Sequence, residues 1–459
     1  MAALRVSLYV FYADYPHSPH TVLFQGQFGF LDKVDRTTAT FLKLGDLSLE
    51  RRSNWGVDAT TFVRLLERGY VTDLSEREER ERFILHAISL HHRLLDQDSP
   101  HFALIPTYEC NLRCSYCFQD HTLHANEAKM TRDIIDKAFA SIQEFTAQEN
   151  KQPSYIQLWG GEPLLRKNRG TIEAILTRCR ALRYPIKAIT NGTELEAYSE
   201  LLGIDGISMV QVTIDGPRPI HNQRRTDELG APTFDKIVEN VSLALDKGVQ
   251  VDLRMNADRS NLDSLAWIGE FASSKGWTRN NKFRLQPANI APTRQTHAAS
   301  LISGAQLLRV LNNAQTGCNL FPESGRIDSL VKFCSSHGRL PLHNATYCSA
   351  MQHYYILDPF GDIYACENEA GVRHKRIGTF LSGQLVLDKS ATAQWRGRTV
   401  ANIPECSRCP AALLCGGGCA HSAEMVSGTY YASYCDGFKS VLANDLPPAF
   451  ERHMTTHPV

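Results

Sequence analysis

Hydrophobic and polar positions follow two different periods through the middle of the chain. Short runs rich in β-branched and aromatic residues predict strands, and longer stretches with apolar residues every three or four positions predict amphipathic helices. The predicted strands are Phe102–Ile105, Tyr155–Trp159, Ile186–Ile189, Met209–Ile214, Val249–Met255 and Lys282–Leu285. The helices predicted between them are Thr131–Thr146, Gly170–Leu182, Phe234–Lys247 and Leu262–Ser274. Because repeated strand–helix units connect parallel strands by right-handed crossovers, we expect a parallel sheet.

The number of these units limits the architecture. About six are visible, which is fewer than the eight of a closed barrel. We therefore expect an α/β protein with an open, partial (β/α)6 barrel over residues 99–335.

Residues 1–98 predict a small α+β unit in front of the barrel. Val6–Tyr12 and Thr21–Leu31 have the composition of strands. A helix is expected to begin near Ser75, because Ser75 and Glu78 have the spacing of a capping box.

The C-terminal part has a different composition. Residues 336–440 are rich in Gly and Cys and contain only short elements, so we expect bound metal to supply much of their stability. Residues 441–459 predict a short helix and a polar tail.

Charge and terminal sequence exclude several classes of protein. The formal net charge is zero, which favours neither a nucleic-acid partner nor a solvating acidic tail. The N-terminus lacks the pattern of a signal peptide, and no apolar run approaches the ~20 residues of a membrane span. We expect a cytoplasmic protein that binds neither membranes nor nucleic acid.

Cysteine is the unusual feature of the composition. Ten of the 13 cysteines fall into two dense groups, and Cys179, Cys318 and Cys334 lie outside them. In a reducing cytosol, thiols separated by two to five residues bind metal more often than they form disulfides.

The first group is Cys110, Cys114 and Cys117, spaced Cx3Cx2C directly after a predicted strand. A structural zinc site needs four ligands. Three thiolates in one loop fit a cubane iron–sulfur cluster with one iron left open for an exogenous ligand. The alternative is a zinc loop completed by His121 or His124.

This triplet, with the aromatic Tyr116 before its last cysteine, resembles the radical S-adenosylmethionine (radical SAM) superfamily. The resemblance implies that the methionyl amine and carboxylate of the cofactor chelate the open iron, with Tyr116 beside them. The segment Gly160-Gly161-Glu162-Pro163 follows the second strand, and by the same resemblance it contacts the methionyl ammonium. A plain turn is the alternative.

Later strand ends continue the resemblance. The segment from Thr213 to Arg225 resembles the Asp-Gly-Pro, His-Asp, Arg run of the peptide- and protein-modifying branch, although Asn222 replaces the usual Asp. The resemblance implies that Thr213 hydrogen-bonds the ribose and that Arg225 lies near the cofactor. Arg254 is expected to pair with the methionyl carboxylate, and its alternative is a surface arginine on a strand.

The second cysteine group has the spacing of a SPASM domain, the twin-cluster extension of many radical enzymes that act on peptides or proteins. A Gx4C step ends at Cys366, and the other members follow the same signature: Cys348, Cys406, Cys409, Cys415, Cys419 and Cys435. The resemblance implies two auxiliary [4Fe–4S] clusters besides the one that binds S-adenosylmethionine. A pair of zinc ribbons is the alternative.

The family topology also implies how the ligands divide. One set is Cys406, Cys409, Cys415 and Cys435, and the other is Cys348, Cys366 and Cys419. The second set lacks one thiolate. Either Cys334 or Cys318 completes it, or its fourth iron stays open to a substrate thiolate.

Two further features bear on the reaction. Glu367 adjoins Cys366, where anaerobic sulfatase maturases have an acidic base, so we expect it to accept a proton; a solvated loop acid is the alternative. The N-terminal unit resembles the leading region of SPASM enzymes that mature ribosomally made peptides. It either binds a precursor leader by strand addition or caps the barrel.

We expect an oxidoreductase that takes an electron from a flavodoxin or ferredoxin and cleaves S-adenosylmethionine to a 5′-deoxyadenosyl radical. The radical abstracts hydrogen from a ribosomally synthesised peptide, which leads to an oxidative cross-link such as a thioether or carbon–carbon bond. The alternatives are formylglycine formation on Cys or Ser of a protein, oxidation of a small metabolite, and a non-catalytic iron–sulfur sensor.

Overall fold

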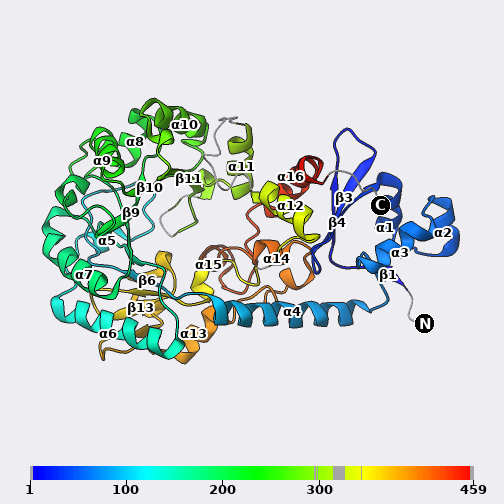
Figure 1. Ribbon diagram of the computed structural model, residues 1–459, viewed down its shortest axis with the longest axis horizontal. Helices are drawn as coiled ribbons and strands as arrows, with labels where there is room; N and C mark the ends of the chain where they lie inside the picture. Colours follow the sequence, from blue (N-terminus) through cyan, green and yellow to red (C-terminus); the bar gives the residue numbers. More distant parts are fainter. Residues whose placement is uncertain (1–3, 294–295, 297, 314–325, 343, 455–459) are drawn as a thin grey trace. The chain divides into compact units, whose positions relative to one another are not determined.

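The computed structural model describes residues 4–293, 296, 298–313, 326–342 and 344–454. The chain forms two compact units (Figure 1). The first unit comprises residues 1–96, 323–348 and 397–459, and the second comprises residues 97–322 and 349–396. The predicted C-terminal segment 336–440 contributes to both units, so it is not a separate compact body.

A single mixed sheet organises the second unit. Its strand order over the described residues is β11-β10-β9-β8-β7-β6-β12-β13-β14-β15. Six consecutive parallel strands are β6 (His101–Leu104), β7 (Ile156–Leu158), β8 (Ile186–Thr190), β9 (Ile207–Thr213), β10 (Gln250–Ala257) and β11 (Phe283–Asn289). Each pairs with the next along the chain, as repeated strand–helix units require. The predicted α/β fold with six parallel strands is confirmed.

The second unit also has helices, several of which lie outside the curved parallel sheet (Figure 1). They are α5 (His121–His124), α6 (Arg132–Glu149), α7 (Arg169–Leu182), α8 (Arg218–Arg224), α9 (Phe234–Asp246), α10 (Leu265–Ser274), α11 (Gly304–Asn313) and α13 (Lys389–Arg396). The amphipathic pattern explains their orientation. In α9, for example, Ile237, Val241 and Ala244 are buried and lie on one side of the helix.

The sheet continues past the predicted barrel. Strand β12 (Tyr354–Leu357) pairs in parallel with β6, and the following strands β13 (Asp362–Tyr364), β14 (Gly378–Thr379) and β15 (Val386–Leu387) add antiparallel neighbours. The stacked rings of Phe102 and Tyr355, with centroids 5.6 Å apart, pack this junction. Residues 349–396 therefore extend the barrel sheet. This extension was not predicted from the sequence, because its strands are short.

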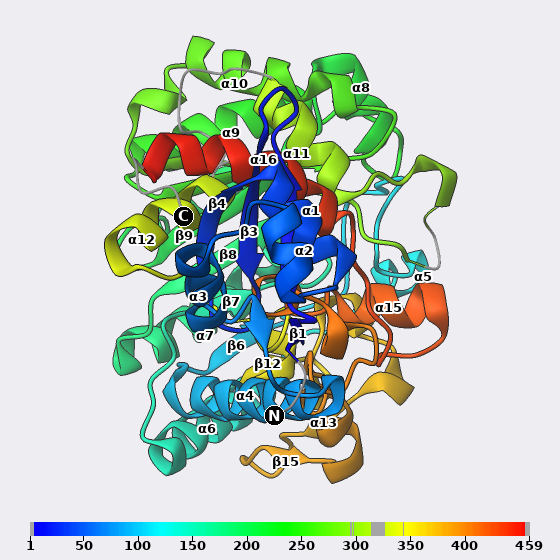
Figure 2. The ribbon, with the colours of Figure 1, turned by 90° about the vertical axis from the view of Figure 1, so that its right-hand side faces the viewer.

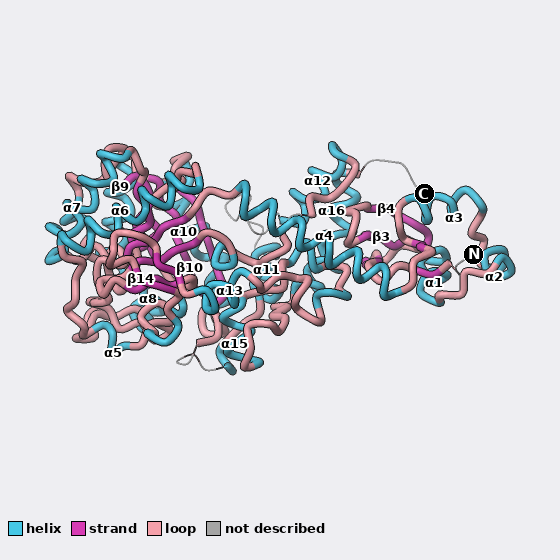
Figure 3. The backbone as a smooth tube through the Cα atoms, turned by 90° about the horizontal axis from the view of Figure 1, so that it is seen from below, coloured by secondary structure: helices cyan, strands magenta, loops and turns pink. Residues whose placement is uncertain are grey.

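The first unit contains two small antiparallel sheets (Figures 2 and 3). One is β2 (Val10–Asp14), β3 (His20–Gln25) and β4 (Leu31–Asp35), and the other pairs β1 (Arg5–Val6) with β5 (Val71–Thr72). Its helices are α1 (Arg36–Leu44), α2 (Leu49–Asn54), α3 (Ala59–Glu67), α4 (Glu76–Gln97), α12 (Arg326–His337), α14 (Ala412–Cys415), α15 (Ala420–Ser427) and α16 (Phe438–His453). The predicted α+β character of this region is confirmed.

Two predictions in this unit have different outcomes. The predicted single strand Thr21–Leu31 is wrong, because a turn that contains Gly29 at φ 80° separates β3 from β4. The predicted capping box is confirmed: Ser75 N donates to Glu78 Oε2 at 2.8 Å, and Glu78 N donates to Ser75 Oγ at 3.3 Å.

A core within the first unit joins its N-terminal and C-terminal segments. The rings of Tyr9 and Phe83 stack with centroids 4.6 Å apart, and Val400, Ile403 and Leu413 belong to the same buried cluster. The Tyr9 hydroxyl also donates to Ser407 O at 2.7 Å. This core supports the loop that carries Cys406 and Cys409. Among the described helices, none is long and apolar enough to cross a membrane.

Candidate active site

A cavity of about 460 Å³ lies at the carboxyl ends of the parallel strands in the second unit. The residues that line it include Cys110, Cys114, Tyr116, Cys117, Gly160, Gly161, Thr213, Arg225, Arg254 and Glu367. These residues come from segments far apart in the sequence, and the ends of parallel strands bring them together. Loops at this edge of a barrel form the active site in enzymes of this architecture.

The three cysteines of the first group follow β6 and carry free thiols. Burial, and then the neighbouring Glu162 and Cys114, raise the pKa of Cys110 above its ordinary range. Burial and the Cys114 thiol raise the pKa of Cys117 to about 12. Since a thiol must lose its proton to bind metal, a cation in the cavity would offset these shifts. The three thiols therefore fit a metal cluster that is bound at the cavity wall.

One of the two histidines proposed as a fourth zinc ligand also lies near these thiols. His124 Nε2 lies 3.7 Å from Cys117 Sγ, and His124 lines the same cavity. The side chain of His121 lies outside the described part of the structure. The position of His124 is therefore compatible with a zinc ion or with an iron–sulfur cluster.

Arg225 supplies a test of whether an anion fits the cavity. Its Nη1 donates to the Tyr116 hydroxyl at 2.6 Å, whereas its buried Nε has no hydrogen-bond partner among the described residues. A buried guanidinium N–H without an acceptor is costly. An anionic group in the cavity, such as a carboxylate or a cluster with its thiolates, would provide one. The residues present therefore fit an iron–sulfur cluster with S-adenosylmethionine.

Gly160 and Gly161 line the cavity because their loop packs on the segment that leads to Cys110. A Cβ atom at Gly161 would lie 2.2 Å from Tyr108 O, and one at Gly160, whose φ is 131°, would lie 2.6 Å from Thr107 O. The same approach allows Glu162 N to donate to Glu109 O at 2.7 Å. Glycine at both positions thus lets the two loops meet, and it leaves the backbone open to a ligand.

Glu162 and Pro163 lie behind these glycines and are absent from the cavity lining. The buried Glu162 carboxylate accepts hydrogen bonds from Thr190 Oγ1 at 2.7 Å and from Asn191 N at 2.5 Å. Burial raises the pKa of Glu162 to about 7, although its donors oppose the rise. Glu162 therefore joins the loops that follow β7 and β8, while a direct contact with the cofactor remains a prediction.

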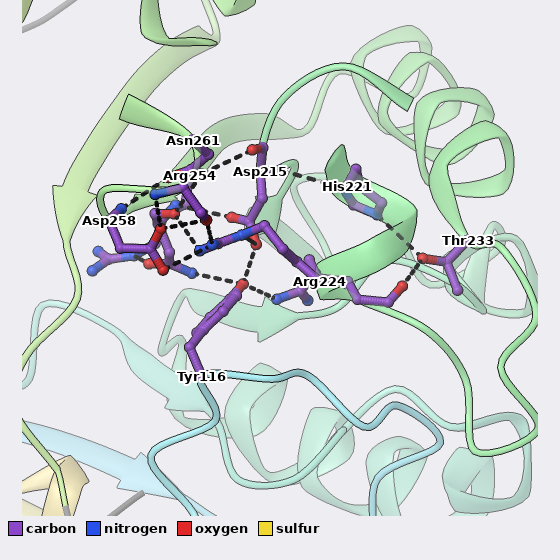
Figure 4. A network of polar contacts seen from close by, with 11 residues as sticks. Tyr116, Asp215, His221, Arg224, Thr233, Arg254, Asp258 and Asn261 are labelled. Carbon is purple, nitrogen blue, oxygen red and sulfur yellow. Dashed lines mark hydrogen bonds and ion pairs between the residues drawn. The ribbon is translucent and has the colours of Figure 1, made fainter. Parts of the chain in front are cut away.

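Tyr116 is the centre of a polar network (Figure 4). Its hydroxyl donates to Asp215 Oδ2 at 2.5 Å and accepts from Asn256 Nδ2 at 3.2 Å. Arg224 approaches Asp215 Oδ2 at 3.5 Å and forms a closer ion pair with Asp258 Oδ2 at 2.8 Å. The network fixes the cysteine loop against the ends of β9 and β10.

The His-Asn pair after the Asp-Gly-Pro segment is structural. His221 Nδ1 accepts from Asp215 N at 3.2 Å, and burial, with Arg225 and Arg224 nearby, lowers the pKa of His221 to about 3. Asn222 Oδ1 accepts from the backbone N–H groups of Thr233 and Phe234 at the start of α9. Because this position needs only an acceptor, Asn can replace the Asp of the resembled family.

Thr213 and Arg254 are neighbours in the register of β9 and β10, and both line the cavity. Arg254 Nε donates to Asn256 Oδ1 at 2.8 Å. The side chain is half-buried in the cavity wall, so it is not a surface arginine. The position leaves its remaining N–H groups available to a carboxylate.

Glu367 follows β13 and lines the same cavity. Its Oε1 accepts from the Tyr354 hydroxyl at 2.7 Å and from Gln157 Nε2 at 3.0 Å. These contacts hold the carboxylate at the cavity wall, and its role as a base stays a prediction. Both hydrogen bonds end on Oε1, so they orient the carboxylate.

Sequence reasoning missed the polar residues inside the barrel. Gln157, Lys187, Gln211 and Asn289 line the cavity from four strands. Lys187 Nζ lies 3.4 Å from Asp252 Oδ2, and Asp252 is buried. A polar residue at alternate positions of an otherwise apolar strand was the available signal, because such residues share one face.

The second cysteine group is divided between the units. Cys406, Cys409, Cys415 and Cys435 lie close together in the first unit, where burial and the three neighbouring thiols raise the pKa of Cys406 to about 12. This proximity agrees with the predicted four-ligand set.

The other auxiliary set stays a prediction, because Cys348 and Cys419 belong to the first unit and Cys366 to the second. Cys334, one candidate for its fourth ligand, is buried in α12 beside Arg68 and Asp32. Cys318, the other candidate, lies outside the described residues.

Comparisons with known proteins identify the domain. Residues 104–266 match the model of the radical SAM superfamily. The chain is 24% identical over 396 residues to the serine-type anaerobic sulfatase-maturating enzyme of Bacteroides thetaiotaomicron, which covers 74% of this chain and 91% of that protein. It is 26% identical over 341 residues to the mycofactocin maturase MftC of Mycolicibacterium smegmatis, which covers 68% of this chain and 76% of that protein.

Solved structures show the same fold. The S-adenosylmethionine-bound protein anSMEcpe matches with a TM-score of 0.57 at 17% identity, over 77% of this chain and 99% of that chain. SuiB from Streptococcus suis, bound to its precursor peptide SuiA, matches with a TM-score of 0.52 at 15% identity, over 94% of this chain and 98% of that chain. Residues 104–266 therefore match the radical SAM superfamily, and the chain shares the fold of these two solved structures.

Proposed function

We propose that this protein is a radical SAM maturase that modifies a ribosomally made peptide oxidatively, by forming a thioether or carbon–carbon cross-link. One observation carries the proposal: the three thiols of the Cx3Cx2C loop and the carboxylate of Glu367 line a single cavity. Similarity to a mycofactocin maturase, and to a structure bound to a precursor peptide, supports the substrate class.

We assign the cofactor side of the cavity to the cysteine loop. Cys110, Cys114 and Cys117 would hold one [4Fe–4S] cluster, which when bound to S-adenosylmethionine supplies the electron that splits it into methionine and a 5′-deoxyadenosyl radical. The backbone of Gly160 and Gly161 would face the methionyl group. Thr213 and Arg254 would hold the ribose and the carboxylate, and Arg225 with Tyr116 would fix the cysteine loop. A flavodoxin or ferredoxin would deliver the electron.

We assign proton transfer to Glu367. Two donors hold its carboxylate at the cavity wall, so it is oriented before a substrate arrives. A positioned carboxylate is a suitable general base for a substrate that loses a proton after hydrogen abstraction.

The two predicted cysteine sets would bind two auxiliary [4Fe–4S] clusters. Oxidation of the substrate releases a second electron after hydrogen abstraction, and the auxiliary sites would take it or hold the substrate sulfur. Four thiols in the first unit support one of these sites.

A sulfatase-maturase reaction is the second candidate. Similarity to the Bacteroides thetaiotaomicron enzyme covers 91% of that protein, and Glu367 lines the cavity, where it would act as the base in the oxidation of Cys or Ser. The peptide substrate and the sulfatase substrate differ in their product, so mass spectrometry separates these two proposals.

The first experiment is incubation of anaerobically reconstituted protein with S-adenosylmethionine and dithionite. We expect release of 5′-deoxyadenosine, and its complete absence would favour a non-catalytic iron–sulfur sensor. The second is mass spectrometry of a co-expressed precursor peptide, in which a cross-link removes two hydrogen atoms. Glu367→Gln should keep cofactor cleavage and lose the product, whereas the control Glu173→Gln, on the exposed side of α7, should keep both.

A further inference from the structure

Arg398 is a fully buried cation in the first unit. Its side chain is 0% exposed, and it is the largest of the fully buried side chains among the described residues. Nη1 donates to Gly418 O at 2.8 Å, and Nη2 donates to Gly417 O at 3.2 Å and Ala432 O at 3.0 Å. Nε donates to Tyr430 O. All of these acceptors are backbone carbonyls.

The described residues give Arg398 no ion pair with a carboxylate. Hydrogen bonds to carbonyls satisfy its N–H groups, but they carry no net charge to balance the guanidinium. A buried charge that lacks a counter-charge is strongly unfavourable. The position of Arg398 therefore indicates an anion near it in the working protein.

Cys406, one of the auxiliary cysteines, lies near this position. A Cβ atom added to Gly417 would lie 3.6 Å from Cys406 Sγ and 3.8 Å from Arg398 Nη1, so both groups lie on the same side of this glycine. Gly417 and Gly418 have φ of 83° and 75°, a conformation that glycine adopts without strain. This turn directs two carbonyls to the guanidinium within the segment that joins Cys415 to Cys419.

We propose that Arg398 is the counter-charge of the auxiliary cluster site in the first unit and raises the reduction potential of that site. The inference rests on the proposed function, which places a cluster on Cys406, Cys409, Cys415 and Cys435. One electron that leaves the substrate radical and enters this site adds one negative charge there. Net charge and hydrogen bonds near a cluster set its potential, so a fixed cation favours the reduced form.

This role agrees with the different electron-transfer roles proposed for the two cysteine groups. The cavity site must donate an electron to S-adenosylmethionine, whereas an auxiliary site must accept one from the substrate. A cation buried beside the auxiliary site favours the reduction of that site. Arg398 is thus a positioning residue, since it acts through the bound group and does not touch the substrate.

The test is an anaerobic potentiometric titration of the reconstituted holoenzyme, followed by electron paramagnetic resonance, with iron content measured for each sample. Arg398→Gln removes the charge and Arg398→Lys keeps it. Arg452→Gln is the control, because Arg452 lies in the same unit, is 57% exposed and pairs with Asp328.

We expect Arg398→Gln to lower the ratio of reduced to oxidised auxiliary cluster at a fixed potential about tenfold, which is 59 mV for a one-electron couple. Arg398→Lys should recover most of this shift, and Arg452→Gln should show none. The potential of the cluster held by Cys110, Cys114 and Cys117 should not change.

Other results separate the two proposals. If the wild type contains the iron of one cluster only, the auxiliary sites and the role of Arg398 both fail. If the auxiliary clusters are present and Arg398→Gln leaves their potential unchanged, only the role of Arg398 fails. If Arg398→Gln cannot assemble the cluster, the Arg398→Lys variant tests the proposal instead. A cluster with the wild-type potential in that variant supports the role of the positive charge, and an equal loss of the cluster contradicts this role.

Discussion

The hydroxyl of Tyr116 donates a 2.5 Å hydrogen bond to the fully buried carboxylate of Asp215. Tyr116 lies between Cys114 and Cys117 in the sequence, whereas Asp215 follows β9. One hydrogen bond therefore fixes the cysteine loop to the strand that carries Thr213. Short hydrogen bonds to a charged acceptor are among the stronger ones in proteins.

Tyr116→Phe should remove this bond and the acceptor of Arg225 Nη1. We expect the free energy of unfolding to fall by about 1–3 kcal/mol, and the rate of 5′-deoxyadenosine formation to fall with it. Chemical unfolding and a cleavage assay measure both effects. Tyr184→Phe is the control, because its hydroxyl bonds Gln152 at 3.2 Å outside the cavity; an equal loss of cleavage in that variant would contradict the role of Tyr116.

Gly161→Ala should prevent the loop after β7 from packing against residues 108–109. The added Cβ would lie 2.2 Å from Tyr108 O and 2.3 Å from Glu109 O, and neither backbone oxygen can move freely. We expect lower iron content after reconstitution and a loss of stability of about 1–3 kcal/mol, as for overpacking. Gly170→Ala adds a methyl group in α7 with nothing within 4 Å, so it should be neutral or stabilising by up to about 1 kcal/mol.

Glu162 should make stability depend on pH. Its pKa is raised from 4.5 to about 7, so the folded chain holds more protons than the unfolded chain between these values. Stability must then decrease as pH rises from 4.5 to 7, by up to roughly 3 kcal/mol at 1.36 kcal/mol per pH unit. Glu162→Gln cannot titrate. The unfolding free energies of the two proteins, measured at pH 5 and pH 8, should diverge in this direction; parallel curves would exclude the effect.

The two cysteine groups should have separable roles. Cys114→Ala should abolish cleavage of S-adenosylmethionine, because it removes one of three ligands in the cavity. Cys409→Ala should retain some cleavage but stop product formation. Cys179→Ala is the control, since this thiol is buried in α7 outside both groups and its loss should not alter iron content. A normal product from the Cys409 variant would refute the auxiliary role.

The strands and helices of the barrel could be predicted because each carries its own periodic pattern. All six parallel strands lie within a few residues of their predicted positions, and the thiols of Cys110, Cys114 and Cys117 meet in one cavity as their spacing predicts. Spacing identifies a site well when the ligands share one loop, because the loop itself limits their separation.

The features that sequence reasoning missed depend on partners remote in the chain. Strand β12 has four residues, and its partner β6 lies about 250 positions earlier, so no local pattern reveals the pairing. The contact between Lys187 and Asp252 could not be predicted for the same reason, because it exists only after β8 and β10 join one sheet. The sequence around Arg398 does not indicate that this side chain is buried, because its burial depends on segments remote in the chain.

The pairing of β12 with β6 also bears on how this chain can be altered. His101 N donates to His353 O at 2.7 Å and Ile105 N donates to Leu357 O at 2.9 Å, so the segment that delivers Glu367 is hydrogen-bonded to the first strand of the barrel. Removing everything after residue 348 would turn a central strand into an open edge, a recognised cause of aggregation. The C-terminal extension therefore cannot be exchanged as an independent part, because any transplant that carries its cysteines must also bring a strand able to pair with β6.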